Sequence, residues 1–228
     1  MRIIAGSAGG IPVKVPPSVT RPTTDRVREA VFSMLGESVV EARVLDLFAG
    51  SGGMGLEALS RGAAHATFVE QQGQAAAIVQ DNLTRSRLKG GQIVKADAFA
   101  TLRRLAESGT HFDMIFADPP YAKKPGDVDF GAKLLEDENL RKVLHPNGIF
   151  VLECMVTKGD GGAIAGWDVL RDRAYGSTRI LILQLPTLTP NDGAIPGAAA
   201  LQSSPAPDAA GHGAESLEED EGARGQVG

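Results

Sequence analysis

The chain has 228 residues, of which 43% are hydrophobic and 22% are charged, and its formal net charge is −5. This composition predicts one globular domain with a buried core plus an appendage. No run of about 18 apolar residues is present, which argues against a membrane span, and the N-terminus lacks the apolar stretch of a signal peptide. With a single cysteine, Cys154, the chain can form no internal disulfide, so we expect a cytoplasmic protein.

The negative charge lies near the C-terminus. Residues 187–228 hold seven acids and one base, a net of −6, so that residues 1–186 sum to +1. The acidic balance therefore does not argue against a nucleic-acid substrate. The same segment is rich in Ala, Gly, Pro and Ser and has no aromatic residue, which predicts a disordered acidic tail. The four histidines share no metal-ligand spacing, and we expect no metal site.

Residues 1–20 predict a β-hairpin extension ahead of the main domain. Residues 2–5 and 11–15 are extended in pattern and flank the Gly-rich turn at 7–10. A helix then begins near Asp25, with Thr23 and Thr24 as candidate N-caps, and its apolar stripe reaches Leu35.

Between Arg43 and residue 186 the pattern alternates between strands and helices. Strands are predicted at 44–48, 66–69, 92–95, 112–117 and 149–154, and helices at 55–60, 74–85, 98–106 and 131–143. Such alternation predicts a parallel sheet with helices on both faces. Two further strands, 167–173 and 179–185, have no helix between them. We therefore predict an α/β fold over residues 21–186, with a seven-stranded, mostly parallel, Rossmann-like sheet that ends in an antiparallel hairpin.

A glycine-rich turn follows the first of these strands. Gly50, Gly52 and Gly55 fit the pattern G-x-G-x-x-G, in which a backbone approaches a ligand closely at a helix N-terminus. Nicotinamide and flavin dinucleotides satisfy this pattern, and so does S-adenosylmethionine. Glu70 ends the next strand, 20 residues after Gly50, where an acid can bind ribose hydroxyls in either case.

Two other acids favour S-adenosylmethionine. Asp46 lies on the strand before the glycines, where a carboxylate can bind a cationic amine but would repel a pyrophosphate. Asp46 could instead hold neighbouring backbone. Asp97 follows the third strand and can accept the adenine amino group, cap the next helix, or do both.

The segment Ile115–Tyr121 joins an apolar strand to an acid, two prolines and an aromatic ring. The prolines stop the strand and hold the following residues extended, at the sheet edge where open α/β folds bind ligands. A planar amino group is a poor nucleophile because its lone pair is delocalised. Asp118 and the carbonyl of Pro119 can accept its two hydrogens, and Tyr121 can stack on the base. The four residues Asp118, Pro119, Pro120 and Tyr121 therefore predict a catalytic loop for amino-group methylation.

Four segments, 1–6, 21–29, 45–52 and 118–121, stand in an order that resembles the RsmD-type 16S rRNA (guanine-N2)-methyltransferases of bacteria. The resemblance covers residues 1 to about 186. The Asp-Pro-Pro-Tyr motif alone is shared with DNA adenine-N6 methyltransferases, whereas segment 21–29 with the N-terminal hairpin is more specific. The resemblance implies a class I methyltransferase fold and methyl transfer from S-adenosylmethionine to N2 of one guanine in 16S rRNA, within assembled or assembling small subunits.

The resemblance and the motifs together give the candidate binding residues. Cofactor-binding residues are expected at Thr23, Thr24, Asp46, Phe48, Gly50, Ser51, Gly52, Gly55, Glu70, Gln71, Asp97 and Ala98. RNA-binding residues are expected at Arg2, Lys14, Arg21, Arg26, Lys123 and Lys124. No obligate protein partner is expected. We expect a monomer, because the sequence contains no long apolar surface helix that would need to be covered by a partner.

Three alternatives remain at this point. An adenine-N6 methyltransferase acting on DNA would usually need a separate target-recognition domain, for which the body leaves little room. A protein-glutamine methyltransferase more often carries Asn where this chain has Asp118. An NAD-dependent oxidoreductase built on the glycine pattern would leave the 118–121 loop without a purpose.

Overall fold

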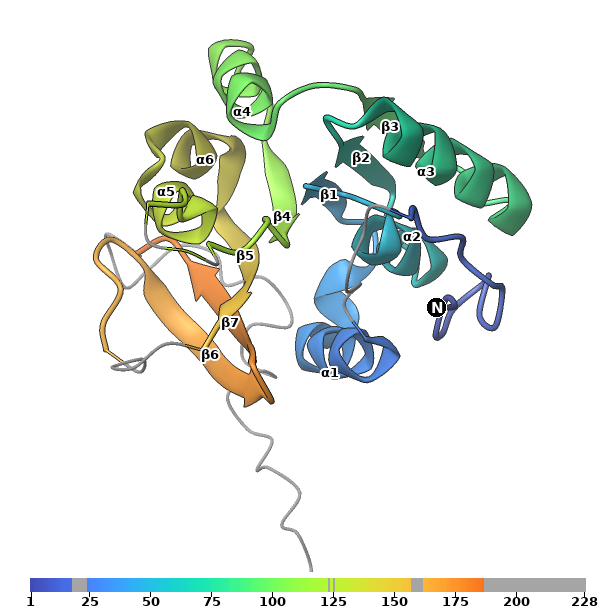
Figure 1. The fold of residues 1–228 in the computed structure, drawn as a ribbon, viewed down its shortest axis with the longest axis horizontal. Helices are drawn as coiled ribbons and strands as arrows, with labels where there is room; N and C mark the ends of the chain where they lie inside the picture. Colours follow the sequence, from blue (N-terminus) through green and yellow to red (C-terminus); the bar gives the residue numbers. More distant parts are fainter. Residues whose placement is uncertain (18–23, 123, 125, 157–161, 187–228) are drawn as a thin grey trace, which may run out of the picture.

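The structure is a computed structural model that describes residues 1–17, 24–122, 124, 126–156 and 162–186. It contains a seven-stranded sheet in the order β3-β2-β1-β4-β5-β7-β6 (Figure 1). Strands β1 to β5 pair in parallel, and β7 runs antiparallel between β5 and β6. The predicted mostly parallel sheet with a closing antiparallel hairpin is confirmed. The strands are β1 (Arg43–Leu47), β2 (His65–Val69), β3 (Gly91–Val94), β4 (Phe112–Ala117), β5 (Leu144–Met155), β6 (Asp168–Tyr175) and β7 (Thr178–Gln184).

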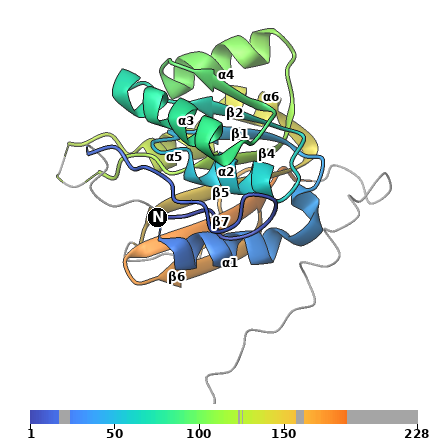
Figure 2. The ribbon, with the colours of Figure 1, turned by 90° about the vertical axis from the view of Figure 1, so that its right-hand side faces the viewer.

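Helices cover both faces of the sheet (Figures 1 and 2). They are α1 (Asp25–Leu35), α2 (Gly53–Ser60), α3 (Gly73–Ser86), α4 (Ala98–Glu107), α5 (Phe130–Glu136) and α6 (Glu138–Val143), with a 3-10 turn η1 (Gly36–Val39) after α1. In the described ranges, no helix combines the length and the apolar character needed to cross a membrane.

Alternate residues of each central strand enter two separate cores. Val44 packs with α1, α2 and α3, whereas its neighbour Leu45 packs with α4, α5 and α6. Successive side chains of a strand point to opposite faces, so a strand buried on both faces is apolar throughout. This is why β1 and β4 are mostly apolar in the sequence, with Asp46 and Asp113 as their acids.

The single helix predicted over 131–143 is wrong, because the chain forms α5 and α6 with a break at Asp137. Asp137 has an extended backbone, and its side chain accepts a hydrogen bond from the Leu140 amide. Asp137 thereby caps a second helix at a point where the apolar pattern predicted that the first helix would continue. Strand β5 is also longer than predicted and begins at Leu144, with an irregularity in its pairing to β4 between Phe112 and Met114.

The N-terminal arm, which we define as residues 1–17, has the predicted antiparallel pairing but no regular strands. Arg2 and Pro12 form an isolated bridge, and the Ile3 amide donates to the Ile11 carbonyl at 3.0 Å. Much of the remaining backbone bonds to helices α2 and α3 instead of across the hairpin.

Helix α2 holds the first half of the arm through two buried side chains. The fully buried Glu57 carboxylate accepts hydrogen bonds from the amides of Ile4 at 2.7 Å and Ala5 at 3.1 Å. The buried Ser60 hydroxyl accepts from the Ala8 amide at 2.9 Å. Gly6 has a φ of +82°, and a Cβ at this residue would lie 1.9 Å from the Ser60 carbonyl oxygen. Only glycine fits this close approach.

Helix α3 holds the second half of the arm. Asn82 accepts from the Lys14 amide and donates to the Lys14 carbonyl, both at 2.9 Å. The same side-chain amide donates to the Ser51 carbonyl in the glycine loop at 3.0 Å. One buried asparagine thus links the arm to the loop after β1.

Candidate active site

The two motif loops leave neighbouring strands at the same edge of the sheet. Strands β1 and β4 are paired in parallel, with Leu47 opposite Ala117. The next residues are Phe48, which begins the glycine loop, and Asp118, which begins the proline loop. The fold therefore brings a ligand-binding turn and a carboxylate-bearing loop side by side.

The glycine loop needs an unusual backbone. Phe48, Gly50 and Gly52 have φ values of 58°, 55° and 80°. Gly52 is the N-cap of α2, which begins at Gly53 and not at residue 55 as predicted. A Cβ at Gly55 would lie 2.3 Å from the Phe68 ring, so glycine is required where the helix crosses β2.

Asp46 is buried beneath this loop with 4% of its surface exposed. Its Oδ2 accepts a hydrogen bond from the Gly55 amide at 2.9 Å, so Asp46 does hold neighbouring backbone. Burial raises the pKa of Asp46 to about 7, the nearby Glu70 charge adds to the rise, and the Gly55 amide opposes it. A bound cation would favour the ionised form of this carboxyl.

Glu70 shapes the other side of the loop. Its Oε2 accepts from the Gly50 amide at 2.9 Å and its Oε1 from the Gln72 amide at 2.7 Å. Each carboxylate oxygen has a second lone pair with which it could accept a ligand hydroxyl. Gln71, between these partners, is exposed.

Asp97 caps helix α4, which was one of the two roles predicted for it beside binding the adenine amino group. Its Oδ1 accepts from the Ala100 amide at 2.9 Å. The second carboxylate oxygen is not used by this cap, and Asp97 is exposed at the sheet edge. Ala98 is buried as the first residue of the helix.

An aromatic cluster beside the glycine loop was only partly predicted. The Phe48 ring lies 6.3 Å from Phe99 and 5.9 Å from Phe130, and the last two rings are stacked at 6.0 Å. The Lys133 ammonium lies 4.1 Å from the centre of the Phe99 ring. Phe99 and Phe130 lie in the first turns of two different helices, and no spacing in the sequence signals that they meet.

The proline loop is anchored to the sheet by its tyrosine. The Tyr121 hydroxyl donates to Glu153 Oε1 at 3.0 Å, and Glu153 lies on β5 with 8% of its surface exposed. Burial and the charges of Glu153 and Asp118 raise the pKa of Tyr121, so the phenol stays protonated and can donate. Pro119 is buried and Pro120 is exposed. The role of Glu153 was not predicted from the sequence. The signal that could have indicated it is the presence of an acid inside the apolar run 149–154.

Helix α1 reaches the same region through a buried arginine that sequence reasoning also missed. Arg28 is 1% exposed, donates to the Arg2 carbonyl and to Asp25, and lies 3.4 Å from the Gly53 carbonyl. Thr24 caps this helix by accepting from the Val27 amide at 3.3 Å. The other candidate cap, Thr23, lies outside the described residues. Together these contacts tie α1 to the start of α2.

The candidate RNA-binding cations that the structure describes are spread over the N-terminal arm, helix α1 and the loop after β4. The Arg2 side chain is 69% exposed and lies 3.9 Å from Asp25, and the Lys14 ammonium pairs with Asp81 at 2.6 Å. Arg26 and Lys124 are exposed. Arg21 and Lys123 lie outside the described residues, as does the predicted tail, 187–228.

Comparison with known proteins agrees with this geometry. Residues 1–184 match the family described as conserved hypothetical protein 95. The ribosomal RNA small subunit methyltransferase D of Escherichia coli is 36% identical over 185 residues, which cover 81% of this chain and 89% of that protein. The chain belongs to this family.

Solved structures of relatives have the same fold. A protein of Escherichia coli described as a candidate methyltransferase, yhhF, is similar with a TM-score of 0.68 and 35% identity over 81% of this chain and 97% of that one. A hypothetical protein of Thermus thermophilus gives a TM-score of 0.67 and 32% identity over 81% and 99%. The sheet is that of the class I methyltransferases, as the resemblance implied. Within the described ranges, His, Cys, Asp and Glu side chains form no group of three that could hold a metal ion.

The raised pKa of Asp46 gives the ligand-free protein a specific pH dependence. In the folded chain the pKa of Asp46 is about 7, above its ordinary value of 3.8. Between pH 3.8 and pH 7 the folded chain therefore keeps a proton on this carboxyl that the unfolded chain has lost. Stability should therefore fall as pH rises through this window, by about 2 kcal/mol from pH 5 to pH 7. The Asp46→Asn variant keeps an acceptor for Gly55 and should lack this component. Melting both proteins across the range checks it, and parallel curves would contradict the assignment.

Proposed function

We propose that this protein transfers a methyl group from S-adenosylmethionine to the exocyclic N2 of a guanine in the 16S rRNA of the small ribosomal subunit. One observation carries the proposal. The cofactor-type loop after β1 and the Asp118–Tyr121 loop after β4 leave paired strands at Leu47 and Ala117. An amino group held at the second loop is thus close to a donor held at the first.

The residues around the first loop fit S-adenosylmethionine. Asp46 is suited to the cationic amine of the methionine part, because pairing with a cation offsets the cost of its buried charge. Glu70 is suited to the ribose hydroxyls, and Asp97 to the adenine amino group. The rings of Phe48, Phe99 and the neighbouring Phe130 offer an apolar wall for the adenine.

When bound, the cofactor would supply a methyl group on a positively charged sulfur, and in-line attack on that methyl would break its S–C bond with a neutral thioether as leaving group. Asp118 and the Pro119 carbonyl accept the two hydrogens of the guanine amino group and draw the nitrogen out of conjugation with the base. After the new N–C bond forms, the nitrogen carries an extra proton, which leaves to Asp118 or through it to water. Positioning supplies most of the acceleration.

Tyr121 holds the target base by stacking, and Glu153 fixes the direction of its ring. A nucleotide must turn out of its stack to reach this loop, which costs a few kcal/mol, and stacking on an aromatic ring returns about 1–3 kcal/mol. The hydrogen bond from the Tyr121 hydroxyl to Glu153 removes rotational freedom before the base arrives.

A pair of Tyr121 variants separates stacking from orientation. Tyr121→Ala should lower kcat/KM for RNA about 10- to 100-fold through lost stacking, and Tyr121→Phe only a few-fold, because it keeps the ring. Steady-state kinetics with a saturating cofactor measure both. Tyr175→Phe, at the other tyrosine of the chain, is the matched control. Equal losses for Tyr121→Ala and Tyr121→Phe would mean that the hydroxyl, and not the ring, serves the reaction.

The relatives support RNA over the other substrates. The family member from Escherichia coli that covers most of this chain is named for ribosomal RNA of the small subunit. The family match ends at residue 184, which supports a methyltransferase domain over 21–186 and an acidic tail outside it. We further propose that the enzyme acts as a monomer on the rRNA of the small subunit or of its assembly intermediate. Adenine-N6 methylation of DNA is the second candidate, because it uses the same Asp-Pro-Pro-Tyr loop.

One assay tests reaction and substrate together. The purified protein is given methyl-labelled S-adenosylmethionine with protein-free 16S rRNA, with small subunits that lack the modification, or with duplex DNA, and the labelled nucleoside is identified by mass. We expect N2-methylguanosine from the RNA or from the subunits. N6-methyladenine from DNA would overturn the substrate, and no labelled nucleoside from any of them would overturn the reaction.

A further inference from the structure

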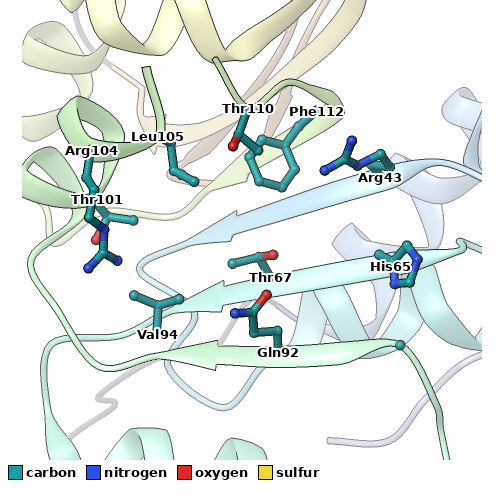
Figure 3. A pocket seen from close by; sticks show the side chains of 11 residues that line it. Arg43, His65, Thr67, Gln92, Val94, Thr101, Arg104, Leu105, Thr110 and Phe112 are labelled. Atoms are coloured by element: carbon teal, nitrogen blue, oxygen red, sulfur yellow. The ribbon is translucent and has the colours of Figure 1, made fainter. Parts of the chain in front are cut away.

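A groove lies on the sheet face that carries α4, beside the edge strand β3. It has a volume of about 590 Å³ and is formed by the beginnings of β1, β2 and β4, by β3 and by α4. Figure 3 shows the side chains of Thr67 and Gln92 on neighbouring strands within it, with Arg104 across from them on α4. None of the residues cited above for the cofactor or for the catalytic loop lines it.

The ionisable residues that line this groove are all basic. They are Arg43, His65 and Arg104, and no acid is among the lining residues that the structure describes. On the sheet, the polar side chains of Thr67 and Gln92 line the groove together with Val94 and Phe112. The core of a protein–protein interface is typically depleted of charge, whereas the side chains of Arg43 and Arg104 line this groove.

Cations continue around β3 onto the far side of the edge. A second hollow of about 410 Å³ is lined by Arg87 and Lys89, and Gly90 belongs to both hollows. Residues 84–105 carry six bases against one acid, a net of +5, in a chain whose net charge is −5. We call this surface the basic edge; all six bases are exposed, and they are Arg85, Arg87, Lys89, Lys95, Arg103 and Arg104.

The position of the basic edge suits a substrate that is larger than one nucleotide. β3 lies three strands from β4 in the sheet order, which is about 14 Å at the usual spacing between strands. A base that enters the site at Asp118 belongs to an RNA chain whose phosphates extend beyond the site. The groove lies at the beginnings of the strands, whereas Asp118 follows the end of β4, so its cations are a further strand length away, at roughly 20 Å from the site in all. Cations at this distance can bind phosphates several nucleotides from the target base without touching it.

We propose that the basic edge is a second RNA-binding surface that holds the phosphate backbone several nucleotides away from the target. This inference rests on the proposed function and extends it from the catalytic loop to an anchoring site. The chemistry is that of phosphodiester anions bound by arginine and lysine, with hydroxyl and amide groups of the groove as further donors. It predicts affinity that depends on salt and contributes no base specificity.

The test uses two double variants of the full-length chain with equal loss of charge. Lys89→Gln with Arg104→Gln removes one cation from each side of the basic edge. Lys142→Gln with Arg173→Gln removes two exposed cations from α6 and β6, outside it. Binding to protein-free 16S rRNA and to small subunits lacking the modification is measured by filter retention over a series of KCl concentrations. Melting and turnover at saturating RNA are measured alongside.

We expect the edge variant to bind protein-free rRNA about 10-fold more weakly than the control variant at low salt. The slope of log affinity against log salt should fall by about one for each phosphate contact that is lost. Melting and saturated turnover should match the wild type. Equal binding by the two variants would overturn the inference and leave the proposed function standing, because the cations would then only protect an edge strand.

Two further outcomes are decisive. If the edge variant loses affinity for subunits but not for protein-free rRNA, the cations meet a ribosomal protein and the phosphate assignment is wrong. If the wild type neither binds nor methylates rRNA, the proposed function is wrong, and this inference, which rests on it, is wrong as well.

Discussion

Replacing Asp118 with alanine is expected to lower the turnover of methyl transfer about 100- to 1,000-fold, as the loss of one positioned group acting in the transition state does. Asp118 is the first residue after β4. It belongs to a loop that is held in place by buried Pro119 and by the Tyr121–Glu153 hydrogen bond. Without it, the amino nitrogen loses an acceptor for its hydrogen and for the proton that must leave. Single-turnover kinetics with labelled cofactor measure the effect.

Two controls make this result specific. Cofactor affinity and melting should stay close to the wild type, because the cofactor contacts proposed for Asp46 and Glu70 come from β1 and from the end of β2. Asp118→Asn keeps an acceptor oxygen but not the charge, and should fall between the alanine variant and the wild type. A turnover near normal in Asp118→Ala would remove this residue from the mechanism.

Replacing Glu57 with alanine should have the largest effect on stability, at about 3–5 kcal/mol. The carboxylate is fully buried, and it accepts hydrogen bonds from the Ile4 and Ala5 amides and from Arg61 at 2.7 Å. Its removal leaves these donors without their acceptor and frees the N-terminal arm from α2. Thermal unfolding should show a loss of roughly 10 °C in Tm for a domain of this size.

The matched control is Glu107→Ala, which removes an exposed acid at the end of α4 and should change stability by less than about 0.5 kcal/mol. Glu57→Gln keeps one acceptor oxygen and should lie between the two. If Glu57→Ala melts like Glu107→Ala, the arm is held by other contacts. A loss of RNA binding that exceeds the loss of folded protein would link the arm to the substrate.

The sequence alone determined the parts of this protein that depend on neighbouring residues. The caps at Thr24 and Asp97, the glycine turn after β1 and the strand ending at Ala117 all follow from patterns within a few positions. Each is governed by backbone preferences and by hydrogen bonds between residues close in the chain. The alternation of strands and helices, with its final hairpin, likewise predicted the order of elements and the fold class.

Local patterns failed where a polar side chain competed with an apolar period. Over residues 130–143 the apolar spacing continues, but the Asp137 side chain captures the Leu140 amide and starts a second helix. In the N-terminal arm, alternation predicted two strands, whereas Glu57 binds the amides of Ile4 and Ala5. In both cases a carboxylate supplied an alternative partner for backbone that the simple pattern assigned elsewhere.

Only the tertiary structure decided which distant residues meet. Tyr121 and Glu153 are 32 positions apart. Phe48 meets Phe99 and Phe130 because the end of β1 and the starts of α4 and α5 lie at one sheet edge. The groove beside β3 likewise combines α4 with β1 and β2, which are separated from it in the chain. Such meetings depend on strand order, which the crossover connections set when β4 pairs with β1, and no spacing within the sequence encodes that choice.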